Sequence, residues 1–234
     1  DHMDDWGNGS REHNGMMGYG GMMGMMRMMM GNGNMMMGYG SQNFTGYNGM
    51  MENYNNERNN ADYSLSAIDM TKEKVKHLAS DLVRRQFGPE YEISDIFVFS
   101  NSPYYISVKE KNSEQGAFEL LFDPIRKTVY PEYGPNMMWN TKYGMNRMMG
   151  WSRPIRDNRI DRKQALEAAS KFASNNNFKV EDEGHQFYGY YTFHTKKNGQ
   201  TTGMLSVNAY TGQVWYHNWH GDLDTMIEIG EHQD

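Results

Sequence analysis

IDRKQALEAASKFA, residues 160–173, joins a helix-start signal to an apolar stripe. Asp161 followed by Gln164 resembles a capping box, in which each side chain bonds the other residue's backbone N–H. The apolar positions after it fall on one helical face: Ala165, Ala168, Ala169, Phe172 and Ala173. Residues 70–87 have the same spacing and stop at Gly88-Pro89, a strong helix terminator. The sequence therefore predicts two amphipathic helices.

Each predicted helix is followed by four runs with the composition of strands. They lie at residues 91–99, 104–111, 117–123 and 128–132, and again at 179–187, 190–197, 203–209 and 213–217. The offset between the two sets is steady: 90 residues from Ala79 to Ala169 and 86 from Tyr104 to Tyr190. A constant offset across a helix and its strands indicates an internal duplication.

The composition divides the chain further. Residues 1–62 consist largely of Met, Gly, Asn and Tyr, a mixture that does not support an ordinary core. We therefore expect an irregular arm (1–62), a first unit (63–133), a Met- and Trp-rich linker with one helical turn (134–158), a second unit (159–222) and a solvated acidic tail (223–234). The predicted fold class is α+β, with a helix packed on an antiparallel sheet in each unit.

The second unit resembles a known family. SVNAYTGQVW, residues 206–215, is similar to the end of a PepSY domain, where a strand finishes in an Asp/Asn-Ala-x-Thr-Gly turn, and residues 160–169 are similar to its opening helix. The first unit departs from this pattern, since its turn reads DPIRK at residues 123–127. PepSY modules occur in propeptides of thermolysin-like peptidases and in exported proteins, so the resemblance implies a binding or inhibitory module and an exported peptidase as a partner.

Several function classes find no support in the residues. A net charge of −6 does not favour nucleic-acid binding, and no apolar run approaches the length of a membrane span. The absence of cysteine excludes thiolate chemistry. No His-Glu-x-x-His, phosphate-binding loop or Gly-x-Ser-x-Gly motif occurs. We therefore expect a protein that is not an enzyme and has no catalytic residues.

Methionine provides the sharpest functional signal. Of the 23 methionines, 12 lie between Met16 and Met37, and MMGYG occurs at both 16–20 and 36–40. Thioether sulfur is a soft ligand that suits Cu(I), which is the candidate cofactor. The candidate ligands are Met16, Met17, Met22, Met23, Met25, Met26, Met28, Met29, Met30, Met35, Met36, Met37, Met137, Met138, Met145, Met148 and Met149.

His217 and His220 complete the predicted metal ligands. They belong to WYHNWH, residues 215–220, in which indole rings stand beside imidazoles. In an extended strand, His217 and His220 would point to opposite faces. A competing interpretation makes them core aromatics with hydrogen-bonded histidines.

These observations favour extracytoplasmic binding of soft metal, chiefly Cu(I), for sequestration or for handover to a copper-handling protein. The first residue is Asp1 rather than an initiator methionine, which fits an exported protein whose signal peptide has been removed. An alternative is a subunit of an extracellular filament or other homopolymer, with the Met/Gly arm connecting the copies. A third hypothesis, modulation of a peptidase, rests on the family resemblance alone.

Overall fold

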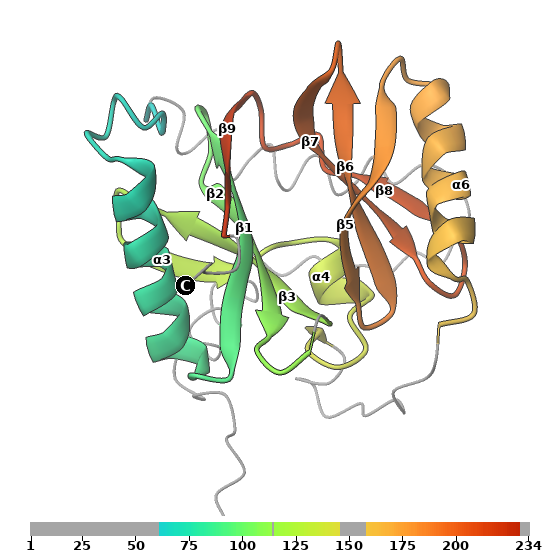
Figure 1. Ribbon diagram of the computed structural model, residues 1–234, viewed down its shortest axis with the longest axis horizontal. Coiled ribbons are helices and arrows are strands. Elements are labelled where there is room, and N and C mark those ends of the chain that lie inside the picture. Colours follow the sequence, from blue (N-terminus) through green and yellow to red (C-terminus); the bar gives the residue numbers. More distant parts are fainter. Residues whose placement is uncertain (1–60, 114, 146–157, 230–234) are drawn as a thin grey trace, which may run out of the picture. The chain divides into compact units, whose positions relative to one another are not determined.

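The computed structural model describes residues 61–113, 115–145 and 158–229. The helices are α3 (Lys72–Phe87), α4 (Pro135–Met138) and α6 (Arg162–Ser174). The strands are β1 (Tyr91–Phe99), β2 (Tyr104–Glu110), β3 (Gly116–Asp123), β4 (Thr128–Pro131), β5 (Lys179–Phe187), β6 (Tyr190–Lys197), β7 (Gln200–Asn208), β8 (Val214–Tyr216) and β9 (Leu223–Glu228). The predicted α+β class is confirmed, and so are the positions of both helices and of eight strands (Figure 1).

Local sequence explains both long helices. The Thr71 side chain accepts a hydrogen bond from the Lys74 backbone N–H at the start of α3, and Gly88 ends that helix with φ 121°. At α6 the predicted capping box between Asp161 and Gln164 is present. Each helix buries one stripe, and corresponding positions lie 90 residues apart: Val75, Ala79 and Val83 in α3, and Ala165, Ala169 and Ala173 in α6.

The described strands form one sheet in the order β8-β7-β6-β5-β3-β2-β1-β9, with β4 paired to β3. Two antiparallel meanders, β1–β4 and β5–β8, meet at a single parallel bridge between Gly116 of β3 and Phe187 of β5. A side chain at Gly116 would come within 2.7 Å of the Phe187 ring, so only glycine permits this approach.

The turns that close the two meanders have the same geometry. Between β3 and β4, the Asp123 carboxylate accepts hydrogen bonds from the backbone N–H groups two and three residues further on, at 3.0 and 2.8 Å, and Lys127 has φ 56°. Between β7 and β8, the Asn208 side chain does the same at 2.9 and 3.1 Å, and Gly212 has φ 72°. Corresponding positions lie 85 residues apart, although the residue types differ.

The predicted acidic tail contains a strand, so that prediction is wrong for residues 223–228. β9 pairs antiparallel with β1, and Ile227, which faces Ile96 across the pair, is buried. An edge strand needs only partial burial, and Asp224 and Glu228 are exposed on β9. Their charge made the segment resemble a solvated tail.

Apolar side chains pack on both sides of the strands. Tyr191, Phe193, Leu205 and Val207 form a core with the alanine stripe of α6. On the other face, Phe97 and Phe99 of β1 and Tyr105 of β2 pack against Met204 of β7. The faces of the two meanders that lie opposite to α3 and α6 therefore meet in an interior, which also contains most of the buried polar side chains described below.

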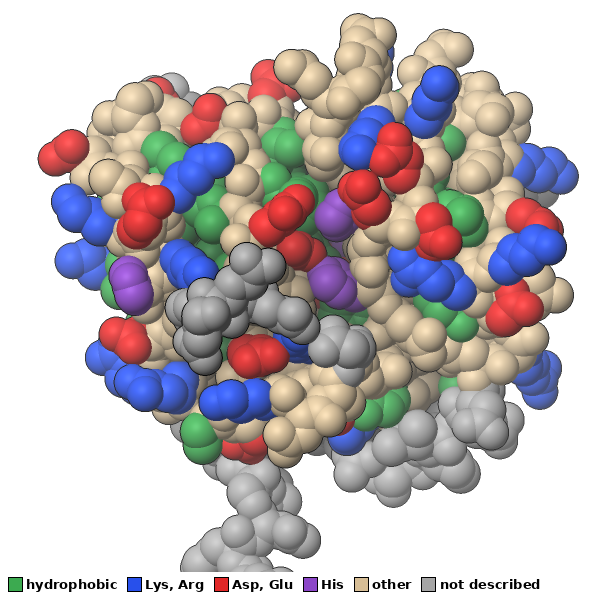
Figure 2. Space-filling view, viewed as in Figure 1, with side chains coloured by type: hydrophobic (Ala, Val, Ile, Leu, Met, Phe, Trp, Pro, Cys, Tyr) green, Lys and Arg blue, Asp and Glu red, His purple; other side chains and the backbone are tan. Residues whose placement is uncertain are grey.

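The surface of the described part carries mixed charge. Figure 2 shows basic and acidic side chains interspersed, with histidines beside acidic groups near the centre of the view. Within the described ranges, no helix is long and apolar enough to span a membrane. The described part of the predicted linker contains a helical turn, α4, as expected, but the linker residues Asn136, Met137 and Asn140 are buried.

Candidate metal centre

The two predicted histidine ligands point the same way, contrary to the expectation of opposite faces. β8 ends at Tyr216, so the extended conformation does not continue to His220, and Gly221 turns the chain with φ 82°. The imidazole rings of His217 and His220 lie 6.2 Å apart between centroids, with their planes at 12°. Both side chains are buried.

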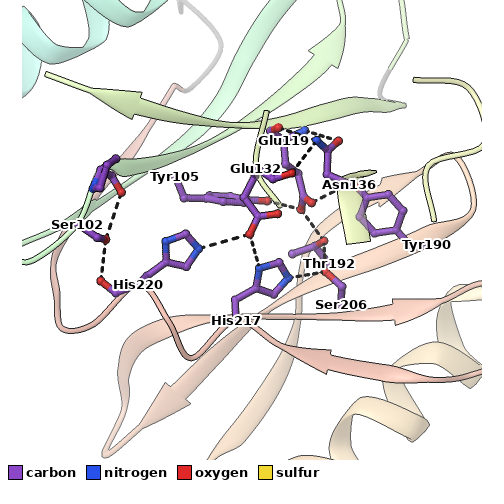
Figure 3. Close-up of polar contacts among 11 residues, drawn as sticks. Ser102, Tyr105, Glu119, Glu132, Asn136, Tyr190, Thr192, Ser206, His217 and His220 are labelled. Atoms are coloured by element: carbon purple, nitrogen blue, oxygen red, sulfur yellow. Dashed lines mark hydrogen bonds and ion pairs between the residues drawn. The ribbon is translucent and has the colours of Figure 1, made fainter. Parts of the chain in front are cut away.

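Glu132, directly after β4, lies between the two histidines (Figure 3). Its Oε1 atom lies 3.0 Å from His217 Nδ1 and 3.7 Å from His220 Nε2. The three groups offer ligand atoms within 4.8 Å of one another, and their side chains are at most 1% exposed. We call Glu132, His217 and His220 the inner triad.

Asn136 of α4 fixes the backbone that carries Glu132. Its amide nitrogen donates to the carbonyl oxygens of Glu119, at 2.9 Å, and Glu132, at 3.2 Å. Its Oδ1 atom accepts from the Glu119 backbone N–H at 3.0 Å. A single buried amide thus holds β3 and the residue after β4 in register, which sets the place of the Glu132 carboxyl.

His220 is held by a different set of contacts. Its ring stacks on Phe99 at a centroid distance of 4.6 Å and on Trp219 at 3.7 Å. Its carbonyl oxygen accepts a 2.7 Å hydrogen bond from Ser102 Oγ, in the turn between β1 and β2. The ring is therefore fixed between two aromatic side chains before any ligand binds.

A chain of hydrogen bonds sets the tautomer of His217. The Thr192 hydroxyl donates to Glu119 Oε1 at 2.8 Å, so in the 2.8 Å contact between Thr192 and Ser206 the donor is Ser206. The Ser206 oxygen must then accept the proton of His217 Nε2, 2.8 Å away. In a neutral ring this leaves a lone pair on His217 Nδ1, aimed at the Glu132 oxygen. Two lone pairs would repel each other at this distance. The contact between His217 Nδ1 and Glu132 Oε1 therefore needs either a proton on the Glu132 carboxyl group or a metal ion between the two atoms.

Glu119 ends this chain as an acceptor. Tyr105 donates to Glu119 Oε1 at 2.5 Å and Tyr190 donates to Oε2 at 3.0 Å, in addition to the bond from Thr192 (Figure 3). The three donors come from β2 and β6, one strand from each meander. Glu119 therefore links the meanders and fixes the direction of every bond toward His217.

Burial controls the protonation of the site. It lowers the pKa of His217 and that of His220 from 6.5 to about 4, and it raises the pKa of Glu119 and that of Glu132 above 4.5. Both imidazoles are consequently neutral near pH 7. Neutral imidazole is the form that coordinates metal ions.

Three buried atoms of the inner triad have no hydrogen-bond partner in the described part of the chain: both ring nitrogens of His220 and Glu132 Oε2. Leaving such an atom unpaired costs about 1–3 kcal/mol. The donor set also fits a metal, because two imidazoles and a carboxylate are common zinc and copper ligands. Tetrahedral coordination with bonds of about 2.0 Å places ligand atoms about 3.3 Å apart, between the two measured separations.

The predicted methionine ligands divide between described and undescribed residues. Met137 is buried in α4, and Met138 and Met145 are partly buried. The other predicted methionine ligands lie outside the described residues. They are the methionines of the N-terminal arm, together with Met148 and Met149 of the linker.

Sequence reasoning missed Glu132 and Glu119. Each is a lone acidic residue in or beside an apolar strand, and neither has a neighbouring histidine in the sequence. The one available signal was an acidic residue inside a strand-like run, AFELLF at residues 117–122, where burial requires a partner.

Comparisons with known proteins give no relative for this chain: no protein-family model, curated protein or solved structure matches it.

Proposed function

We propose that this chain is a non-enzymatic metal-binding protein, with the inner triad as its metal site. The observation that carries the proposal is the position of His217, whose Nδ1 atom lies 3.0 Å from a Glu132 carboxylate oxygen while its Nε2 atom lies 2.8 Å from the Ser206 hydroxyl. A metal ion bound there would use that lone pair, the Glu132 carboxylate and a His220 nitrogen. The Nε2–H of His217 would still donate to Ser206, the outer hydrogen bond that commonly orients a histidine ligand.

Copper is the metal that suits the whole chain best. Imidazole and carboxylate groups bind Cu²⁺ more tightly than they bind the other divalent first-row metals. Thioethers, by contrast, select Cu(I). The inner triad supplies the first kind of donor, and the methionines of residues 16–37 supply the second. Zn²⁺ is the competing metal for the inner triad, since it also accepts two imidazoles and a carboxylate.

Burial favours binding over catalysis. The inner triad side chains are at most 1% exposed, so a substrate would have no route to a bound metal without a rearrangement of the fold. A catalytic metal keeps a position open for water or substrate. Storage of the ion needs no open coordination position, and it needs access to the site only while the ion enters or leaves.

The repeated architecture supports the PepSY hypothesis and, through it, an extracytoplasmic location. A helix followed by four strands occurs twice in the same order, and the closing turns share an 85-residue offset and the same side-chain hydrogen bonds. We propose that both units are diverged PepSY-like copies.

Copper titration of the full chain tests the inner triad. The chelator-treated protein is titrated with Cu²⁺ by calorimetry, and H217A and H220A are compared with H77A, which removes an exposed histidine from α3. We expect the two triad variants to lose the tightest site, with affinity reduced roughly 100-fold or more, and H77A to retain it.

A conservative variant and a methionine variant complete the test. E132Q keeps the size of the side chain and removes the ligand charge, so a loss of affinity in folded E132Q cannot be attributed to unfolding. Replacing Met16–Met37 with leucine tests the predicted Cu(I) ligands separately. Unchanged Cu²⁺ affinity in H217A, H220A and E132Q would refute the metal centre.

A further inference from the structure

The inner triad is closed to solvent, although an ion that binds there has to enter and leave. Its side chains are at most 1% exposed, so an element that covers them must move. β1, β2 and β7 each pair with a strand on both sides, whereas β9 pairs only with β1 among the described strands. An edge strand opens at a lower free-energy cost than a strand held on both sides. β9 is therefore the element to examine first.

The segment that leads into β9 carries one of the proposed ligands. β8 ends at Tyr216 beside β7 in the second meander, and β9 pairs with β1 in the first, so the chain crosses between the meanders (Figure 1). We call residues 218–228 the strap. His220 lies in the strap, and Gly221, with φ 82°, turns the chain directly after it.

Few buried side chains hold the strap in place. Of the six residues of β9, only Ile227 is buried, at 7% exposure. Leu223 and Met226 are partly buried against Phe97 and Phe99. Because the Phe99 ring also stacks on His220, the strap covers the same interior that holds the inner triad. The strap is thus a cover with a small apolar contact of its own.

The hydrogen bonds at the start of the strap join it to the turn after β1. Ser102 Oγ donates to the His220 carbonyl oxygen at 2.7 Å, and the Ser100 backbone N–H donates to the Asp222 carbonyl oxygen at 3.1 Å. These bonds bind the strap backbone and not the imidazole of His220. They position the ligand while the strap is closed, and they must break when it opens.

The other two ligands do not depend on the strap. The His217 backbone N–H donates to the Met204 carbonyl oxygen at 3.2 Å, and its Nε2 atom lies 2.8 Å from Ser206 Oγ, so β7 holds both its backbone and its ring. Glu132 follows β4 in the first meander. If the strap separated from β1, His220 would leave with it, while His217 and Glu132 would stay and become accessible.

We propose that the strap controls access to the inner triad: an ion enters and leaves when residues 218–228 separate from β1, and ligation by His220 holds the strap closed. This inference rests on the proposed function, since it concerns how the same site is filled and emptied. The coupling is reciprocal. A bound ion lowers the population of the open strap by the same factor by which closing the strap tightens ion binding.

Hydrogen exchange of the full-length wild type is the first test, in chelator and then with one equivalent of Zn²⁺. Zn²⁺ is the probe because it takes imidazole and carboxylate ligands and does not favour thioethers. In chelator, we expect β9 amides to show at least roughly tenfold lower protection than those of β2 and β7. Zn²⁺ should raise the protection of β9 at least roughly tenfold. Equal protection of β9 and β2 in chelator would overturn the proposal.

A matched pair of variants tests whether the strap limits ion release. I227A removes the buried side chain of β9, and I93A removes an isoleucine of 4% exposure from β1, where it pairs with Val108 and not with β9. Transfer of Zn²⁺ to excess chelator should be at least roughly tenfold faster in I227A than in wild type, and changed less than roughly threefold in I93A. Equal acceleration in both variants would show that release follows general loosening of the fold and would refute the strap as the route.

Failure of the strap proposal and failure of the proposed function give different results. A wild type that binds neither Zn²⁺ nor Cu²⁺ refutes the metal centre, and the strap proposal falls with it. A wild type that binds Zn²⁺ at a site lost in H217A, but whose β9 amides gain no protection, retains the metal centre and refutes the strap proposal alone. Should I227A not fold, the exchange of the wild-type amides decides in the same way.

Discussion

Replacing His220 with phenylalanine should change how the stability of the chelator-treated protein depends on pH. The His220 ring lies between Phe99 and Trp219, with both nitrogens unpaired in the described part of the chain. Phenylalanine keeps the flat ring and removes the two buried polar atoms. Near pH 7 the added bulk of phenylalanine should destabilise the fold, whereas the removal of two unpaired polar atoms should stabilise it. We therefore expect the free energy of unfolding to change by about 1 kcal/mol or less.

The effect appears as the solution is acidified. Burial lowers the pKa of His220 from 6.5 to about 4, so between these values the unfolded chain binds a proton that the folded chain does not. The neutral ring thus contributes stability that is complete above pH 6.5 and is lost as the pH falls toward 4. At pH 5 the loss is about 2 kcal/mol, and H220F lacks it.

Glu132 shifts the comparison in the same direction. Burial raises the pKa of Glu132, and the contact with His220 partly offsets that rise. Removing the imidazole in H220F should therefore raise the pKa of Glu132 further. A raised carboxyl pKa contributes stability at low pH that is lost as the pH rises. H220F should therefore gain at least about 2 kcal/mol relative to wild type between pH 7.5 and pH 5, when urea unfolding is followed by circular dichroism in chelator. An equal difference at the two pH values would show that His220 is not held neutral by burial.

Three further substitutions test the packing around the site, each by urea unfolding in chelator. E119A leaves three hydroxyl donors without their acceptor and should cost about 3 kcal/mol or more, whereas E119Q, which keeps an amide oxygen, should cost less; equal losses would contradict the acceptor role. A169L overfills the fully buried contact of α6 and should cost about 1–3 kcal/mol, against about 0.5 kcal/mol or less for the exposed control E167L. D161A breaks the capping box and should cost about 1 kcal/mol, while the exposed K163A should not.

Regular periodicity made most of the fold predictable. The buried alanines of α6 and the apolar runs of β1, β2 and β3 follow the repeats of their secondary structures, so spacing alone located them. β9 lacks that signal, because its burial depends on pairing with β1 from the far end of the chain. The turn after Asp123 looked unlike the one after Asn208, although both side chains bond the backbone in the same way.

The candidate site was only partly predictable. His217 and His220 stood out as histidines among indoles, but their shared direction depends on where β8 ends. Glu132 reaches them from 85 residues away, a distance that no local pattern spans. The contact between Asp95 and His185 depends on two register shifts, at Asp95 and before Gly184, and sequence alternation cannot place a bulge.

The most direct test of the account is X-ray absorption spectroscopy of the full chain loaded with one equivalent of copper. The account predicts nitrogen and oxygen neighbours, with the outer-shell scattering of two imidazoles, and the loss of that scattering when His217 and His220 are replaced. A metal surrounded by thioether sulfur, or imidazole scattering that survives both replacements, would contradict a metal centre at Glu132, His217 and His220.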